Sequence, residues 1–281
     1  MLEASSYIGL KIGQQEMSPL AMAALRNLCT FIVLSPVLLV TGTHLQLKAA
    51  TQRVRAGLVV MGVLGYCVAS LLIFAAVSGL SATTAGLLQA FRPLLALLLG
   101  LALLRDRPSR LQVIGVAVIL LGAYLFFPAT LVPNELVAMA ILLGGYALMV
   151  VCQVIGRGLG MAGLGTLTIV GVPFAIGGVV LTGVLLSVDG VPQLSGRAVA
   201  VMAWLVIGSS AAGFALMYHA LRRLTNVELS SMTNLVPLVT AAFAVAVLGE
   251  TLGANMVAGL LIATAGVFIV QWRSPPGGKP S

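Results

Sequence analysis

Residues 80–126 read LSATTAGLLQAFRPLLALLLGLALLRDRPSRLQVIGVAVILLGAYLF, and residues 224–270 read LTNVELSSMTNLVPLVTAAFAVAVLGETLGANMVAGLLIATAGVFIV. The two stretches align without a gap at an offset of 144 residues. Their identical positions are Leu80/Leu224, Pro93/Pro237, Leu94/Leu238, Ala102/Ala246, Leu104/Leu248, Val113/Val257, Gly115/Gly259 and Gly122/Gly266. In both copies a proline interrupts an apolar run, an acid follows that run (Asp106 or Glu250), and two glycines lie in the next run. This shared punctuation predicts that the chain consists of two related halves.

The composition of the chain indicates a membrane protein. Of its 281 residues, 60% are hydrophobic and only 8% are charged, and the mean hydropathy is +1.12. An average soluble domain has roughly 25% charged residues. A helix needs about 20 apolar residues to cross the hydrocarbon core, where water cannot satisfy backbone hydrogen bonds. Most of this chain must therefore be helix within lipid, and a soluble fold is excluded.

The apolar runs predict about ten transmembrane helices. They cover residues 4–12, 20–40, 56–77, 82–104, 111–127, 136–155, 164–188, 198–221, 227–248 and 254–270. The first run is short, and we count it because the repeat requires a helix there. An odd number of helices per half inverts the second half, as in many secondary transporters. The predicted fold is an all-α integral membrane protein with two inverted five-helix repeats, residues 1–128 and 133–272, and a cytoplasmic tail, residues 273–281.

Basic residues gather in the connectors that alternate with the apolar runs. With the N-terminus inside, eleven of them lie on the cytoplasmic side and only Arg197 lies outside. The eleven are Lys48, Arg53, Arg55, Arg105, Arg107, Arg110, Arg157, Arg222, Arg223, Arg273 and Lys279. This bias follows the positive-inside rule, so the net charge of +8 reflects topology and not nucleic-acid binding. We expect a multi-pass protein of a bacterial cytoplasmic membrane with both termini in the cytoplasm.

Nothing in the sequence predicts catalysis. Cys29, Cys67 and Cys152 each lie in an apolar run without the spacing of a metal site. Residues 158–163 satisfy the string GxGxxG, but no strand precedes them, so the match carries no nucleotide-binding meaning. We expect no enzyme activity, no metal and no cofactor.

Three segments, two of them within the repeated stretches quoted above, resemble a known family. They are SPLAMAALR (18–26), QAFRPLLALLLGLALLRDRPSRLQVIGVAVILLGAYL (89–125) and TNLVPLVTAAFAVAVLGETLGANMVAGLLIATAGVFIV (233–270). These segments resemble the EamA family of the drug/metabolite transporter superfamily, and the resemblance spans nearly the whole chain. It implies ten helices in two inverted repeats and the export of amino acids, metabolites or drugs.

The resemblance also implies structural roles for several residues. The matching positions are the mid-helix prolines Pro93 and Pro237, the Gly249–Glu250 pair, Arg26 in the second helix, and the small-residue seam of Gly115, Gly122, Gly259 and Gly266. The first helix departs from the family, because SSYIGLKIG (5–13) matches only the second half of the usual segment. Either the true start lies upstream or this helix is shortened. Arg92 is a second departure, because an uncharged residue is expected there, as Val236 provides in the second copy.

Arg92 is the first functional candidate, because it lies about ten residues into its span, where a charge is costly. Gln89 stands one turn away on the same face, and the pair would present donors to a carboxylate or phosphate. The alternative is that Arg92 bonds backbone carbonyls freed by the Pro93 kink. The other substrate-binding candidates are Ser230, Thr233, Asn234, Tyr66, Tyr146 and Lys11. For these residues the alternative is structural pairing between helices.

No Asp or Glu falls deep within the expected spans, so the buried cations have no expected anionic partner. This pattern favours a small-molecule substrate that is anionic or zwitterionic, such as an amino acid or organic acid. The leading hypothesis is a secondary transporter, an exporter that works by alternating access at a midplane cavity between the repeats. The alternatives are a non-transporting receptor or assembly protein on the same fold and an exporter of cationic or aromatic drugs. Membrane lipids are the expected surroundings, nucleic acid is not an expected partner, and a homodimer stays open.

Overall fold

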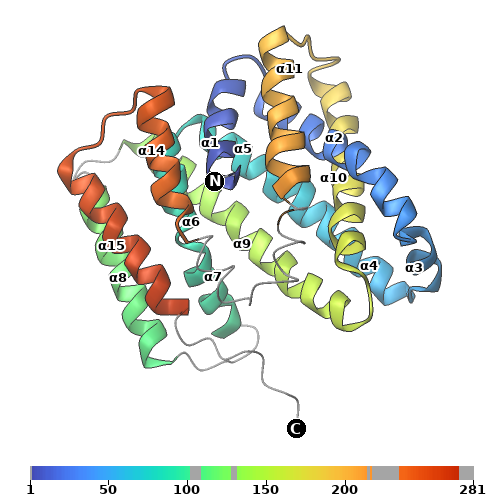
Figure 1. Ribbon diagram of the computed structural model, residues 1–281, viewed down its shortest axis with the longest axis horizontal. Coiled ribbons are helices and arrows are strands. Elements are labelled where there is room, and N and C mark those ends of the chain that lie inside the picture. Colours follow the sequence, from blue (N-terminus) through green and yellow to red (C-terminus); the bar gives the residue numbers. More distant parts are fainter. Residues whose placement is uncertain (1, 102–108, 128–131, 214–215, 217–233, 272–281) are drawn as a thin grey trace.

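The structure, a computed structural model, describes residues 2–101, 109–127, 132–213, 216 and 234–271 (Figure 1). Every regular element in these ranges is a helix. Six helical stretches are long and apolar enough to cross a membrane: Pro19–Val40, Gln52–Ser78, Ala82–Leu99, Pro133–Met161, Thr166–Val188 and Ala254–Gln271. Shorter apolar helices cover Arg110–Phe126, Gly196–Ala212 and Val236–Leu248. The chain is therefore all-helical and multi-pass where it is described, while the count of ten helices stays a prediction.

The first half of the chain contains helices α1 to α8. Their bounds are α1 (Leu2–Gly13), α2 (Pro19–Val40), α3 (Thr43–Ala49), α4 (Gln52–Val60), η1 (Met61–Ala69), α5 (Ser70–Ser78), α6 (Ala82–Gln89), α7 (Arg92–Leu99) and α8 (Arg110–Phe126). The symbol η marks a π-helix, and α4, η1 and α5 follow one another without a break. Ser18, Ser81 and Ser109 precede α2, α6 and α8, and each side chain accepts the N–H of the third residue after it. These serine caps fix where the three helices begin.

The second half of the chain repeats this order. Its elements are α9 (Pro133–Met161), α10 (Thr166–Val188), α11 (Gly196–Ala203), η3 (Trp204–Ala212), α14 (Val236–Leu248) and α15 (Ala254–Gln271). The sequence offset of 144 residues recurs, because α7 and α14 begin at Arg92 and Val236, and α8 and α15 begin at Arg110 and Ala254. The segments η1 and η3 also correspond, to within one residue. π-Helices are rare and cluster near functional sites, so a matched pair is a distinctive feature of both repeats.

The run predicted as one helix over residues 82–104 is broken in its middle. The N–H groups of Ala90 and Phe91 donate to the carbonyls of Leu87 and Leu88, at 2.8 and 3.1 Å, in tight turns between α6 and α7. Pro93 then occupies the second position of α7. Proline, which has no N–H, is tolerated there because the N–H groups of the first turn have no partner within the helix. The break places the preceding residue, Arg92, at the start of a new helix.

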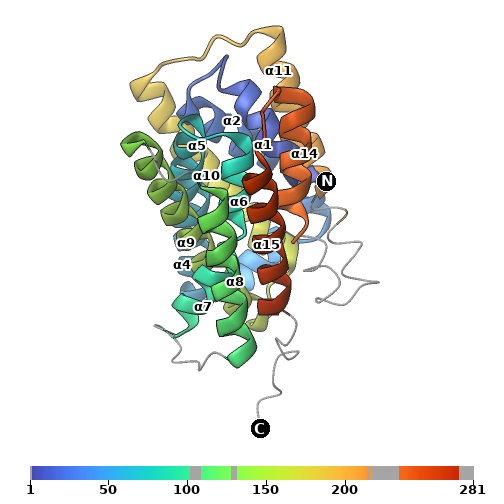
Figure 2. The same ribbon diagram turned by 90° about the vertical axis from the view of Figure 1, so that its left-hand side faces the viewer.

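The helices α8 and α15 lie side by side and form the tightest seam between the two halves (Figure 2). A Cβ atom on Gly122 would lie only 2.4 Å from the backbone nitrogen of Ala263, and one on Gly259 would lie 2.5 Å from the carbonyl oxygen of Gly122. Gly115 and Gly266 meet in the same way, two helical turns along the seam. Glycines of the two repeats therefore pack against each other, as close helix contact in membranes requires.

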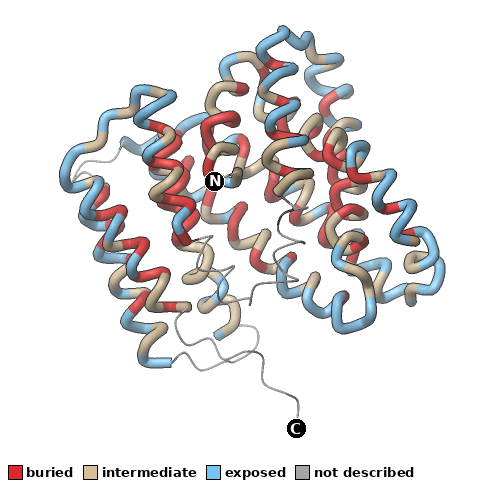
Figure 3. The backbone as a smooth tube through the Cα atoms, viewed as in Figure 1, coloured by how far each residue is buried: buried red, intermediate tan, exposed pale blue. Residues whose placement is uncertain are grey.

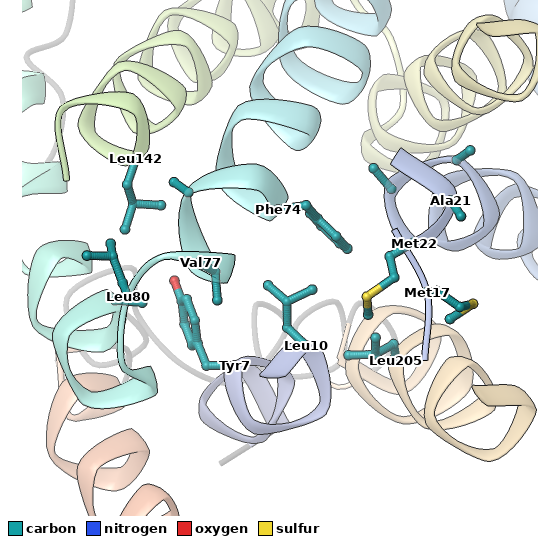
Figure 4. Packing of buried hydrophobic residues seen from close by; sticks show 14 of the residues in the cluster. Tyr7, Leu10, Met17, Ala21, Met22, Phe74, Val77, Leu80, Leu142 and Leu205 are labelled. Carbon is teal, nitrogen blue, oxygen red and sulfur yellow. The ribbon is translucent and has the colours of Figure 1, made fainter. Parts of the chain in front are cut away.

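The short helix α1 lies among the other helices of the bundle and is covered by both halves. Buried residues concentrate around it (Figure 3), and Tyr7 and Leu10 point toward Phe74 and Val77 of α5 (Figure 4). On another side α1 packs against Leu205 of η3. A helix of only 12 residues thus joins the core of the first half to that of the second.

Replacing Gly122 by valine tests the glycine seam. The new side chain would meet backbone atoms of α15 that cannot move aside, so we expect a loss of roughly 1–3 kcal/mol in stability. The measurement is the thermal unfolding midpoint of the detergent-purified protein. Gly183→Val is the matched control, because no atom lies within 4 Å of a Cβ at Gly183. Equal midpoints for the two variants would contradict the role of the seam.

Candidate functional site

Arg92 forms an ion pair with a carboxylate of α1. Its Nη1 lies 3.7 Å from Oε1 of Glu3, and 27% and 45% of the two side chains are exposed. The same oxygen of Glu3 accepts a hydrogen bond of 2.5 Å from Nε2 of Gln89. The predicted pair of Arg92 and Gln89 is therefore brought together, and a third residue from α1 completes the group.

Two tyrosines extend this polar cluster. The hydroxyl groups of Tyr7 and Tyr146 share a buried hydrogen bond of 2.7 Å. The guanidinium carbon of Arg92 lies 5.7 Å from the centre of the Tyr146 ring, within the range of a cation–π contact. Tyr146 comes from α9, so residues of α1, the α6–α7 break and α9 converge at one place. We call Glu3, Tyr7, Gln89, Arg92 and Tyr146 the central cluster.

A second arginine lies next to the central cluster. Nε of Arg26 donates to Oγ of Ser210 at 3.3 Å, and its guanidinium carbon lies 5.7 Å from the centre of the Phe74 ring. Arg26 is also close enough to Tyr7 and Glu3 to interact with them electrostatically. The cluster and its neighbour thus contain two guanidinium groups and one carboxylate, which leaves an excess of one positive charge.

Arg26 and the next residue of α2 contact the two π-helices at equivalent positions. Asn27 donates from Nδ2 to the carbonyl oxygen of Tyr66 in η1, while Arg26 donates to Ser210 in η3. Tyr66 and Ser210 are 144 residues apart and therefore correspond in the repeat. Sequence analysis identified Arg26 but missed Asn27, for which no pattern within one span gave a signal.

The structure corrects the sequence interpretation of Glu3, which belongs to α1. The apolar run begins at Ala4, so hydropathy places Glu3 outside the helix. In the structure α1 begins at Leu2, and its 12 residues cover only about 18 Å from the end at Gly13. Glu3 therefore lies partway through the bundle, at the depth of Arg92.

The remaining predicted site residues are not joined to the central cluster by hydrogen bonds or ion pairs of the described residues. Nζ of Lys11 donates to the carbonyl of Ser78 at 3.3 Å, and Nδ2 of Asn234 donates to Oε1 of Gln271 at 2.9 Å. The ring of Tyr66 packs edge-on against Phe174, with centres 4.4 Å apart. Ser230 and Thr233 lie outside the described residues.

Two buried oxygen atoms near the break between α6 and α7 have no hydrogen-bond partner among the described residues. They are Oε1 of Gln89 and Oγ1 of Thr240. Thr240 lies on α14 beside Gly86, where a Cβ would be 3.0 Å from its side chain. An unsatisfied acceptor in a buried site is costly, so Gln89 offers an oxygen to a ligand that carries a donor.

A groove of about 450 Å³ lies on the opposite face of α1. Its lining residues are Ser5, Ile8, Gly9, Ile12, Arg197, Ala200, Val201, Trp204, Phe243 and Val247. At 100° per residue, Ser5 and Gly9 point away from Glu3 and Tyr7. Nε1 of Trp204 donates to Oγ of Ser5 at 3.2 Å beside this groove. The groove is therefore separate from the central cluster.

Comparison with known proteins decides the family. The model of the EamA-like transporter family matches residues 1–127 and 136–272. The chain belongs to this family. It is therefore a membrane transporter of the drug/metabolite transporter superfamily, as the sequence resemblance implied. A solved structure described as "Crystal structure of protein" matches with a TM-score of 0.66 and 16% identity, covering 95% of this chain and 93% of that one, which shows the fold alone. No curated protein matches the chain.

Glu250, the acid that follows α14 in this EamA transporter, has a structural role. The carboxylate of Glu250 accepts the N–H groups of Ala82 and Thr83, at 2.7 and 3.2 Å, and the hydroxyl of Thr83 at 2.6 Å. It thus caps α6 from the other repeat. At the same end of the bundle, Glu16 of the first half meets Arg197 of the second at 3.9 Å. Polar contacts therefore tie the two halves together at the end predicted to be outside.

The hydrogen bond between Tyr7 and Tyr146 can be tested by a double-mutant cycle. Tyr146→Phe strands the buried hydroxyl of Tyr7, and we expect a cost of about 1–3 kcal/mol. Removing both hydroxyls should cost less than the sum of the single changes, by about 1 kcal/mol. The measurement is thermal unfolding in detergent, with Tyr124→Phe on the exposed face of α8 as the control. If the losses of stability from the two single changes add up in the double variant, the two hydroxyl groups are not coupled.

Proposed function

We propose that this transporter is a secondary exporter of a small metabolite that carries a carboxylate, such as an amino acid or an organic acid. The observation that supports it is the central cluster, where Arg92 lies at a helix break inside the bundle. With Arg26 nearby and Glu3 as the one carboxylate of the described residues at the cluster, these groups carry an excess positive charge. An anionic substrate offsets that excess, a zwitterion can place its carboxylate against Arg92 without changing the net charge, and a cation adds to the excess.

The donors and acceptors of the cluster fit such a substrate. Arg92 has five N–H donors in a planar fork and makes one ion pair, at 3.7 Å, with the residues that the structure describes, so donors remain for a carboxylate. Oε1 of Gln89 has no donor among those residues, and Glu3 is partly exposed. An ammonium or hydroxyl group next to the substrate carboxylate would bond these two acceptors. This arrangement favours amino acids and hydroxy acids over simple carboxylates.

Transport would follow alternating access between the two halves, residues 1–128 and 133–272. The central cluster combines α1, α6 and α7 of the first half with α9 of the second, so relative motion of the halves would open it to either side. The contacts of Glu250 and Glu16 would have to break when the site opens outward. We place the protein in a bacterial cytoplasmic membrane, with both termini in the cytoplasm and export as the direction.

A cationic aromatic drug is the second candidate substrate. The exposed part of Glu3 and the rings of Tyr7 and Tyr146 offer one negative charge beside two aromatic surfaces. Arg92 opposes this reading, because it lies against the same carboxylate. A substrate panel that varies only charge separates the two candidates.

Three probes with the same three-carbon skeleton provide that panel: glycerate is an anion, serine is a zwitterion, and serinol (2-aminopropane-1,3-diol) is a cation. The full-length protein in proteoliposomes should transport glycerate or serine and leave serinol outside. Labelled organic acids, amino acids and cationic drugs of larger size extend the panel. A preference for cations that survives Arg92→Ala would overturn the proposal.

Replacing Arg92 by glutamine tests the residue itself. Loss of a bidentate, charge-assisted contact should lower transport of the preferred carboxylate by at least about tenfold, because such contacts contribute more than about 1.4 kcal/mol. Initial rates in proteoliposomes with equal protein content provide the measurement. Arg157→Gln removes an exposed cation of α9 away from the central cluster instead and should stay within about twofold of the wild type. Similar losses in both variants would count against a substrate role for Arg92.

A further inference from the structure

We infer that Glu3 is an internal counter-ion, which occupies Arg92 when the site is empty and gives way to the carboxylate of the substrate. The inference rests on the proposed function and assigns the mode of transport. A carrier with its own counter-ion can return empty across the membrane. It therefore performs net transport, whereas a carrier without one is limited to exchange of one substrate for another.

The geometry around Glu3 fits a replaceable partner. Arg92 and Glu3 are 3.7 Å apart, both are partly exposed, and Gln89 holds the carboxylate by a hydrogen bond of 2.5 Å. Because Gln89 is a separate anchor, Glu3 can leave Arg92 and keep one hydrogen bond. The two charged residues come from α1 and from the start of α7, so the ion pair does not depend on a single rigid helix.

The charge count explains why an empty carrier needs Glu3. Arg26, Arg92 and Glu3 together carry one excess positive charge when no substrate is bound. Without the carboxylate of Glu3 the excess is two, and closing the site around it buries an unpaired guanidinium, which is strongly unfavourable. A bound carboxylate lowers the excess back to one. A variant without Glu3 should therefore close with substrate and fail to close without it.

Flux measurements on Glu3→Gln test this directly. Proteoliposomes that contain the full-length protein are given [14C]glycerate in the outside medium. Uptake into a lumen without glycerate requires the carrier to return empty, whereas uptake into a lumen that contains glycerate can proceed by exchange. We expect net uptake to fall by at least about tenfold, as for a buried charge left unpaired, and exchange to stay within about twofold. Glu135→Gln, which removes a carboxylate from the first turn of α9 away from the central cluster, should leave both rates unchanged. Net uptake equal to the wild type would overturn the inference.

A readout without any substrate keeps the two proposals separate. Spin labels at Ser78→Cys and Ser187→Cys, both exposed near the outer end and one in each half, report the distance between the halves. Cys29, Cys67 and Cys152 are replaced by alanine in this background. The substrate-free carrier with Glu3 should sample more than one distance in liposomes, because it can reorient while empty.

The substrate-free Glu3→Gln carrier should collapse to one distance, and the double variant Glu3→Gln/Arg92→Gln should regain the others. Recovery in the double variant distinguishes a counter-ion from a simple packing contact, which a second substitution would not restore. Failure to recover, or an unchanged distribution in Glu3→Gln, would overturn the inference. If the wild type moves none of the probes while these distances behave as expected, the proposed substrate is wrong and the counter-ion stands.

Discussion

The charge of Arg92 inside a membrane bundle is the constraint on which the rest of the structure depends. An isolated guanidinium there would be costly, and three elements from distant parts of the sequence reduce that cost. α1 supplies Glu3, α9 supplies the Tyr146 ring, and the break before Pro93 frees Arg92 from the middle of a continuous helix. The position of the short α1 in the core follows from this requirement, because no other described element brings a carboxylate to Arg92.

The repeat supplies the scaffold and its departures from symmetry supply the chemistry. The glycine seam, the matched π-helices and the helices that start at Arg92 and Val236 are shared by both halves. At the decisive position, however, the second half has valine instead of arginine. Val236 packs in the same core cluster as Tyr7 and Tyr146. An arginine at position 236 would add a third guanidinium group to those of Arg92 and Arg26, so valine there limits the positive charge in the core.

The sequence predicted the features that depend on local pattern or on the repeat. Hydropathy located the helices, the proline marked the broken span, and depth within an apolar run singled out Arg92 with Gln89 one turn before it. The role of Glu3 was not predicted because its partner, Arg92, is 89 positions away, and no local pattern links an acid at the edge of an apolar run to that arginine. The π-helices were not predicted for a different reason. Their residues are as apolar as those of an α-helix, so the change in backbone hydrogen bonding leaves no signal in the composition.

Arg26 and Asn27 connect the two π-helices through one helix, α2. Adjacent residues on one helix hold equivalent points of η1 and η3, Asn27 through the carbonyl of Tyr66 and Arg26 through Ser210. A π-helix has wider turns and less regular hydrogen bonding than an α-helix, so it bends at lower cost. Any motion of one half relative to the other must therefore move α2 with both segments or break one of these contacts. Since Arg26 also interacts electrostatically with Tyr7 and Glu3, the same side chain connects η3 to the charge balance around Arg92.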